Sequence, residues 1–100
     1  MLDTASDLAA RLKDPALLET RAYVAGEWVA ADDGATFDVW NPARGDVICQ
    51  VADLTRAETA RAIAAAETAQ KDWAARTAKE RANILRRWFD LMVEHADDLA

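Results

Sequence analysis

The chain has 100 residues, of which 30% are charged and 52% are hydrophobic, so its length and composition suit one small globular domain. Its formal net charge of −6 argues against nucleic-acid binding, which needs a basic surface. No run approaches the ~18 apolar residues of a membrane span. The start, Met1-Leu2-Asp3-Thr4, lacks the basic region and apolar core of a signal peptide, so we expect a cytoplasmic protein. The single cysteine permits no internal disulfide.

Residues 1–20 are predicted to form a short, exposed N-terminal arm. Asp14 and Pro15 suit the N-cap and first-turn positions of a helical turn ahead of Leu17-Leu18. Because the apolar pattern is short, we expect this arm to be docked or frayed.

Residues 21–53 are predicted to form a small antiparallel β-meander. Residues 23–29 divide into two short strands around Ala25-Gly26, which suits a tight hairpin. Asp32-Asp33-Gly34 supplies a second turn, and the next strand begins at Phe37.

The turn after this strand has the clearest local chemistry. Pro42 fixes φ and pushes Asn41 toward extended geometry, where Asn41 can form an Asx-turn. Gly45 tolerates φ > 0 where the chain re-enters a strand. Apolar residues then alternate over 47–51, so Cys49 is predicted to lie on the buried face of that strand.

Residues 55–100 are predicted to form a pair of amphipathic helices, which makes the segment α+β. The runs Thr55–Glu58 and Thr77–Glu80 have the spacing of capping boxes, which begin helices. The first helix presents a stripe of small residues that ends at Trp73, and this favours close approach to another backbone.

The second helix has an apolar arc of roughly 200°, against the ~100° stripe of a surface helix, so one partner helix cannot cover it. Its large members include Leu85, Trp88 and Met92. Asp97 and Asp98 stand where a helix C-terminus disfavours negative charge, and no Gly or Asn closes the pattern. We therefore expect the N-terminal segment of a larger protein.

No group of side chains is predicted to be catalytic. A core cysteine is the better interpretation of Cys49, because no His lies near it in sequence. His95 is the only histidine, and the sequence places no cysteine near it to complete a metal site. The acidic pairs at 32–33 and 97–98 are interpreted as solvated charge, and the glycines form neither a dinucleotide fingerprint nor a P-loop.

Four motifs, taken in order, resemble the N-terminus of the NAD(P)-dependent aldehyde dehydrogenase superfamily. They are Tyr23-Val24-x-Gly26-x-Trp28, Asn41-Pro42-Ala43-x-Gly45-Asp46-Val47-Ile48, Ala65-Ala66 before Trp73, and Thr77-x-x-Glu80-Arg81-x-x-x-Leu85. The resemblance covers nearly the whole chain. Leu12-Lys13-Asp14-Pro15 and the run Lys79–Phe89 look most like the succinate-semialdehyde dehydrogenase branch.

The resemblance implies a parent enzyme of the α/β class, with a Rossmann-like cofactor domain, a catalytic domain and an oligomerisation arm. Such an enzyme oxidises an aldehyde, here succinate semialdehyde, to its carboxylic acid with NAD or NADP. The family's nucleophile, general base and cofactor contacts belong to sequence beyond Ala100. The resemblance therefore implies no catalytic or cofactor-binding residue here, a need for the rest of the polypeptide, and a homo-oligomer of two or four chains.

The resemblance also implies one ion site. Some family members hold a structural monovalent cation with main-chain oxygens just before Asn-Pro, and these correspond to Val39 and Trp40. Many members have Thr where this chain has Val39, so any side-chain contribution is lost.

A second hypothesis stays open, in which the chain is a self-contained acidic module without catalysis. Its exposed helix face would then bind a partner helix. Continuation of the reading frame past Ala100 into a Glu-x-Gly-Lys-Pro-like segment would favour the enzyme.

Overall fold

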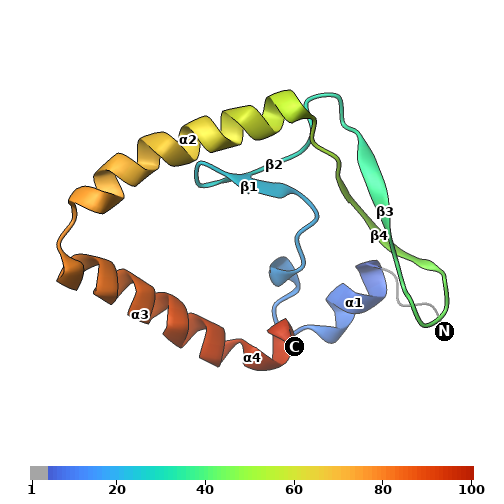
Figure 1. Ribbon diagram of the computed structural model, residues 1–100. Coiled ribbons are helices and arrows are strands. Elements are labelled where there is room, and N and C mark those ends of the chain that lie inside the picture. Colours follow the sequence, from blue (N-terminus) through green and yellow to red (C-terminus); the bar gives the residue numbers. More distant parts are fainter. Residues whose placement is uncertain (1–4) are drawn as a thin grey trace.

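The structure, a computed structural model, describes residues 5–100, and residues 1–4 of the predicted arm lie outside that part. The elements in chain order are α1 (Ala5–Arg11), the 3-10 turn η1 (Pro15–Leu17), β1 (Ala22–Val24), β2 (Glu27–Val29), β3 (Thr36–Trp40), β4 (Val47–Ala52), α2 (Arg56–Ala75), α3 (Ala78–Glu94) and α4 (Ala96–Leu99). Figure 1 shows them arranged as a ring with an open centre, in which α4 returns to the neighbourhood of the N-terminal arm.

Two separate two-stranded sheets stand where the sequence predicts one meander. β1 pairs with β2 and β3 pairs with β4, both antiparallel. Residues 30–35 form a turn of their own, in which the N–H of Gly34 donates to the carbonyl of Ala31 at 2.9 Å. This turn sends the chain away from β2, so β3 pairs only with β4.

Both hairpin turns form where the sequence predicts them. Ala25 and Gly26 have φ of 52° and 83°, which suits a two-residue turn between twisted strands. In the β3–β4 turn, the N–H of Ala43 donates to the side-chain oxygen of Asn41 at 2.9 Å, and Gly45 has φ of 77°. The predicted Asx-turn and glycine position are therefore confirmed.

The predicted starts of both long helices are also confirmed. Reciprocal hydrogen bonds of a capping box join Thr55 to Glu58 at α2 and Thr77 to Glu80 at α3. Figure 1 shows the two helices diverging from the short connection between them, as two sides of the ring. Neither long helix therefore covers the apolar face of the other.

The second predicted helix does not continue to the end of the chain. It breaks at His95, whose backbone has φ of −103° and ψ of 18°, and α4 begins at the next residue. Asp97 and Asp98 therefore lie in the first turn of a new helix, where the helix dipole favours negative charge. Their interpretation as misplaced charges at a helix C-terminus is wrong, because periodicity alone does not reveal so short a break.

The ring has almost no core. Within residues 7–100, Ala31 is the one buried hydrophobic residue, at 6% exposure. The accessible surface is 7870 Å², whereas a compact protein of 11.0 kDa exposes about 5,600 Å². The radius of gyration is 17.0 Å, against about 13 Å for a compact chain of this length. The segment therefore has well-formed elements without an interior of its own.

Candidate functional site

An exposed apolar surface lies along α3, and we call it the α3 face. Its members are Ile84, Leu85, Trp88, Phe89, Leu91, Met92 and Val93, with exposures from 39% at Leu91 to 61% at Trp88. Most recur at spacings of three and four, which places them along one broad side of the helix. No helix within residues 5–100 has the length and apolar character to cross a bilayer.

Two open hollows lie along the α3 face. One of about 320 Å³ is lined by Leu17, Trp88, Leu91, Met92, His95 and Leu99. The other, of about 430 Å³, is lined by Asn83, Ile84, Arg87, Trp88 and Leu91. Because these linings are largely apolar, the hollows suit packed side chains rather than a charged ligand.

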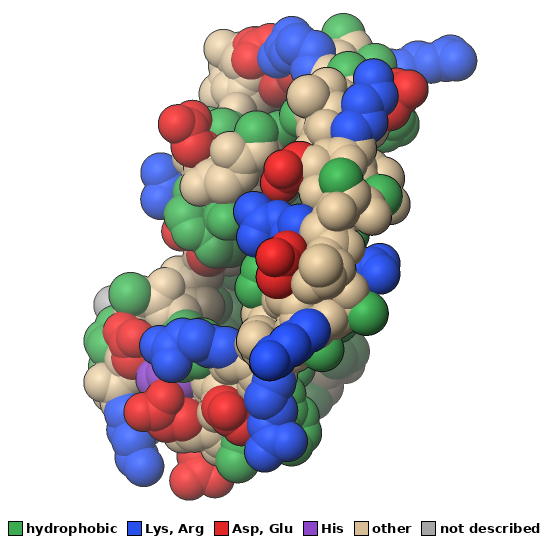
Figure 2. Space-filling model, turned by 90° about the vertical axis from the view of Figure 1, so that its left-hand side faces the viewer, with side chains coloured by type: hydrophobic (Ala, Val, Ile, Leu, Met, Phe, Trp, Pro, Cys, Tyr) green, Lys and Arg blue, Asp and Glu red, His purple; other side chains and the backbone are tan. Residues whose placement is uncertain are grey.

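The side of the ring formed by α2 and α3 carries mixed charge. Figure 2 shows acidic and basic side chains interspersed over this side, with apolar side chains between them. Two of the ion pairs are local to a helix: Arg76 with Asp72 at 3.3 Å, and Arg86 with Asp90 at 3.2 Å. Exposed pairs at this spacing contribute little stability, and mixed charge of this kind is typical of a solvated surface.

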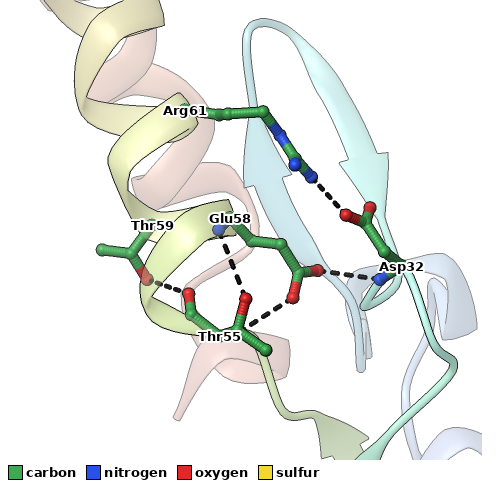
Figure 3. A network of polar contacts seen from close by, with 5 residues as sticks. All are labelled: Asp32, Thr55, Glu58, Thr59 and Arg61. Carbon is green, nitrogen blue, oxygen red and sulfur yellow. Dashed lines mark hydrogen bonds and ion pairs between the residues drawn. The ribbon is translucent and has the colours of Figure 1, made fainter.

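Glu58 anchors the start of α2 to the chain that follows β2. It is buried, at 6% exposure, and its carboxylate accepts the N–H of Thr55 at 2.9 Å and that of Asp32 at 2.8 Å (Figure 3). Arg61, one turn later, donates to the carboxylate of Asp32 at 2.6 Å. The amide of Thr55, and then the amide of Asp32, lower the pKa of Glu58, so the carboxylate stays ionised at neutral pH.

Sequence reasoning found only half of this anchor. The capping partner Thr55 lies three residues from Glu58 and has a recognisable spacing, but Asp32 lies 26 residues away. No local pattern could have shown that one carboxylate serves both segments.

The described residues do not fit a nicotinamide cofactor. Such a cofactor places its pyrophosphate on free N–H groups at a helix N-terminus, behind a glycine-rich turn. The carboxylates of Glu58 and Glu80 already reach back over the starts of α2 and α3. The hollow beside Glu58 is about 150 Å³, below the ~300–1,000 Å³ of small-molecule sites.

The predicted cation ligands Val39 and Trp40 lie at the end of β3. Val39 pairs with Cys49 and Trp40 with Val47, so Ile48 is an extra residue that makes a bulge on β4. Successive carbonyls of a regular strand point to opposite edges, so an ion cannot take both without a local change of backbone direction. Within the described part of the chain, no three His, Cys, Asp or Glu side chains form a metal site. The main-chain site stays a prediction.

The other residues singled out from the sequence lie on separate elements. Cys49 is half-buried on β4 rather than fully buried, because a two-stranded ribbon covers little of its own surface. His95 is half-buried at the break between α3 and α4.

Neither acidic pair is simply solvated, which corrects the sequence-based interpretation. Asp32 pairs with Arg61, as described, and Asp33 accepts the N–H of Ala35 at 2.9 Å. Asp98 accepts hydrogen bonds from the N-terminal arm.

Comparison with known proteins shows to which protein family this chain belongs. Residues 28–100 match the family model described as "Aldehyde dehydrogenase family". The chain belongs to the aldehyde dehydrogenase family. The inference drawn from the four sequence motifs is therefore confirmed, and the family is one of oxidoreductases.

The aldehyde dehydrogenase relatives are much longer than this chain. Glutarate-semialdehyde dehydrogenase from Pseudomonas aeruginosa is 58% identical over 90 residues, which are 90% of this chain and 19% of that protein. The succinate-semialdehyde dehydrogenase [NADP(+)] GabD from Escherichia coli is 50% identical over 90 residues, again 90% and 19%. The crystal structure of succinate-semialdehyde dehydrogenase from Burkholderia pseudomallei gives a TM-score of 0.84 at 55% identity, covering 89% of this chain and 18% of that one.

These matches explain a ring without a core. The chain spans about a fifth of the length of the aldehyde dehydrogenases it matches. Since the same conformation occurs within a larger solved chain, the open ring is a shape that this family adopts.

Proposed function

We propose that this chain is the N-terminal segment of an NAD- or NADP-dependent enzyme that oxidises a semialdehyde to its carboxylic acid, with succinate semialdehyde as substrate. The observation that carries the proposal is a family-typical ring whose α3 face stays exposed. A self-contained binding module would need a core, and within residues 7–100 Ala31 is the one buried hydrophobic residue.

The substrate class comes from the chemistry of the relatives' named substrates. Succinate semialdehyde and glutarate semialdehyde both carry a carboxylate at the far end from the aldehyde. They differ by one methylene, which a binding pocket discriminates by only about 1–3 kcal/mol. We therefore include glutarate semialdehyde as a second substrate, and the cofactor is NADP or NAD.

In this proposal the segment is structural. Residues 1–20 are an arm, residues 21–53 are the β part, and residues 55–100 are helices of a Rossmann-like cofactor domain. The α3 face packs against the rest of the same polypeptide. Burial of one large apolar side chain stabilises by roughly 1.5–3 kcal/mol, so covering this half-exposed face contributes several kcal/mol.

The proposal extends to assembly and to an ion. We expect a cytoplasmic homo-oligomer of two or four chains, and a monovalent cation on the main-chain oxygens of Val39 and Trp40. The bulge at Ile48 and the missing N–H of Pro42 support the ion site, because both reduce the hydrogen bonding that carbonyls nearby receive.

A chimera tests the structural role. Residues 12–100 of this chain replace the matching segment of the Escherichia coli relative, and the chimera is expected to stay soluble and to oxidise succinate semialdehyde. Trp88→Glu places a charge in the α3 face and is expected to abolish soluble enzyme. Lys71→Glu, at an exposed position of α2, is the matched control. An inactive parent chimera, or an active one carrying Trp88→Glu, would contradict the proposal.

Steady-state kinetics of the full-length enzyme test the substrate. Succinate semialdehyde, glutarate semialdehyde and butanal are compared with each cofactor. A substrate carboxylate held by hydrogen bonds contributes about 1.5–3 kcal/mol, so we expect kcat/KM for the semialdehydes to exceed that for butanal by roughly 10- to 100-fold. Equal values would reject the substrate class and leave the family assignment intact.

A further inference from the structure

A single carboxylate joins the N-terminal arm to the end of the chain. One oxygen of Asp98 accepts the backbone N–H of Lys13 at 3.0 Å, and the other accepts that of Asp14 at 3.0 Å. The joined residues lie 85 and 84 positions apart in sequence. In Figure 1 the C-terminal end of the chain lies beside the end of α1, where this contact joins the two ends of the ring.

The two amides belong to a short segment that also has hydrogen bonds within itself. The N–H of Ala16 donates to the side chain of Asp14 at 3.1 Å, which caps η1, and the N–H of Leu18 donates to the carbonyl of Pro15 at 3.2 Å. The N–H groups of Lys13 and Asp14 therefore lie just before a capped turn, which leaves them available to donate to Asp98.

An apolar contact accompanies the polar one. Leu17 of η1 lines the 320 Å³ hollow together with Trp88, Met92 and Leu99. The arm thus covers one end of the α3 face. If the two hydrogen bonds to Asp98 were lost, that end of the face would be open.

Asp98 differs from its neighbour Asp97 in the way this role requires. Both lie in the first turn of α4, but Asp98 is half-buried whereas Asp97 is exposed. A carboxylate accepts on both oxygens, and an amide side chain accepts on only one. The geometry of the contact therefore calls for Asp at this position.

We propose that Asp98 is a clasp, which holds residues 12–18 as a strap against α4 and the end of the α3 face. The clasp closes the ring, and its release frees the strap as a unit while the hairpins and α2 stay folded. This inference goes beyond the proposed function, because it concerns contacts within the segment and no substrate or cofactor.

Hydrogen exchange of the full-length polypeptide, followed by mass spectrometry, tests the clasp. In the wild type, the amides of Lys13 and Asp14 are expected to be protected. In Asp98→Asn their exchange is expected to rise by about tenfold, the lower end for hydrogen bonds to charged groups. Asp97→Asn makes the same change of charge on the adjacent residue and is expected to exchange like the wild type. Peptides from α2 serve as the internal reference for folding.

Each result decides the proposal. Faster exchange over residues 12–18 in Asp98→Asn alone, with α2 unchanged, supports it, as does faster tryptic cleavage after Lys13. Unprotected Lys13 and Asp14 amides in the wild type would overturn it. Equal exchange in the two variants would do the same. Loss of protection in α2 would also overturn it, since Asp98 would then be needed for the whole fold rather than for the strap.

Discussion

Two carboxylates join segments of this chain that lie far apart in sequence, alongside a backbone hydrogen bond from the N–H of Ala52 to the carbonyl of Thr20. Glu58 joins α2 to the loop after β2, and Asp98 joins α4 to the arm. Glu19 works locally: the guanidinium of Arg21 donates to it at 2.9 Å and is the main reason that its pKa falls to about 2. In all three cases the N–H donors favour the ionised form of the acid.

Glu58 predicts how stability depends on pH. Its pKa in the fold is lowered, so its contribution to stability is present above its unfolded pKa, near 4.5, and is lost as pH falls through the folded value. Glu58→Gln is therefore expected to lower the melting temperature of the full-length enzyme at pH 7. The gap from the wild type should shrink below about pH 4. Thermal melts at several pH values measure this difference in melting temperature between Glu58→Gln and the wild type.

The control for Glu58 is Glu67→Gln, on the exposed side of the same helix. It changes the charge equally and is expected to leave the melting temperature nearly unchanged at every pH. A gap for Glu58→Gln that stays constant from neutral to acidic pH would contradict the role of its ionised form.

At the scale of elements, the two hairpins and two helix starts follow from local chemistry. The turn residues adopt the φ values that their positions demand, and the rings of Tyr23 and Trp28 pack edge to face across β1 and β2, 4.9 Å between centroids. Local consistency of this kind lets small elements form with little tertiary support.

The β1–β2 turn contains a residue that is not suited to its backbone. Ala25 is the one non-glycine residue in the described chain with positive φ, at 52°. The left-handed region costs such a residue roughly 1–2 kcal/mol, whereas Asn tolerates it. Ala25→Asn is expected to stabilise the full-length enzyme by about 0.5–1 kcal/mol in denaturant unfolding. Ala30→Asn lies outside the turn and is expected to leave the stability unchanged. Equal stabilisation by the two variants would contradict this account.

The β3–β4 turn depends on Gly45. A Cβ built there meets no atom within 4 Å, so a substitution is penalised through its φ of 77° and not through a clash. We expect Gly45→Val to lower the free energy of unfolding by about 1–2 kcal/mol, and Gly45→Asn by clearly less. Equal losses for Val and Asn would point to packing instead of backbone conformation.

The sequence predicts features that depend on residues a few positions apart. It does not reveal contacts between segments far apart in the chain. The Asx-turn at Asn41 and the capping box at Thr55 are determined by residues within three positions, and the structure confirms both. The predictions of a single meander and of an uninterrupted last helix are wrong. The turn over residues 30–35 separates the two hairpins, and the break at His95 is too short for periodicity to reveal.

At the scale of the whole molecule, the missing core governs behaviour in solution. The 100-residue chain alone is expected to bind no NAD or NADP, to bind a dye that reports apolar surface, and to self-associate at micromolar concentration. Trp88→Glu should reduce dye binding, and Lys71→Glu should not. Calorimetric titration and sedimentation measure these properties. A monomer that melts cooperatively and binds no dye would favour the self-contained module.

The four tryptophans differ in exposure, so their intrinsic fluorescence can report on the surroundings of this segment. Trp73 is half-buried, whereas Trp28, Trp40 and Trp88 are 48%, 57% and 61% exposed. Indole emission moves to shorter wavelength when water leaves the ring. Trp88 lies in the middle of the α3 face, so in an enzyme whose other tryptophans are replaced by Phe its emission reports whether that face is covered. Assembly of the enzyme can therefore be followed in real time without an added label.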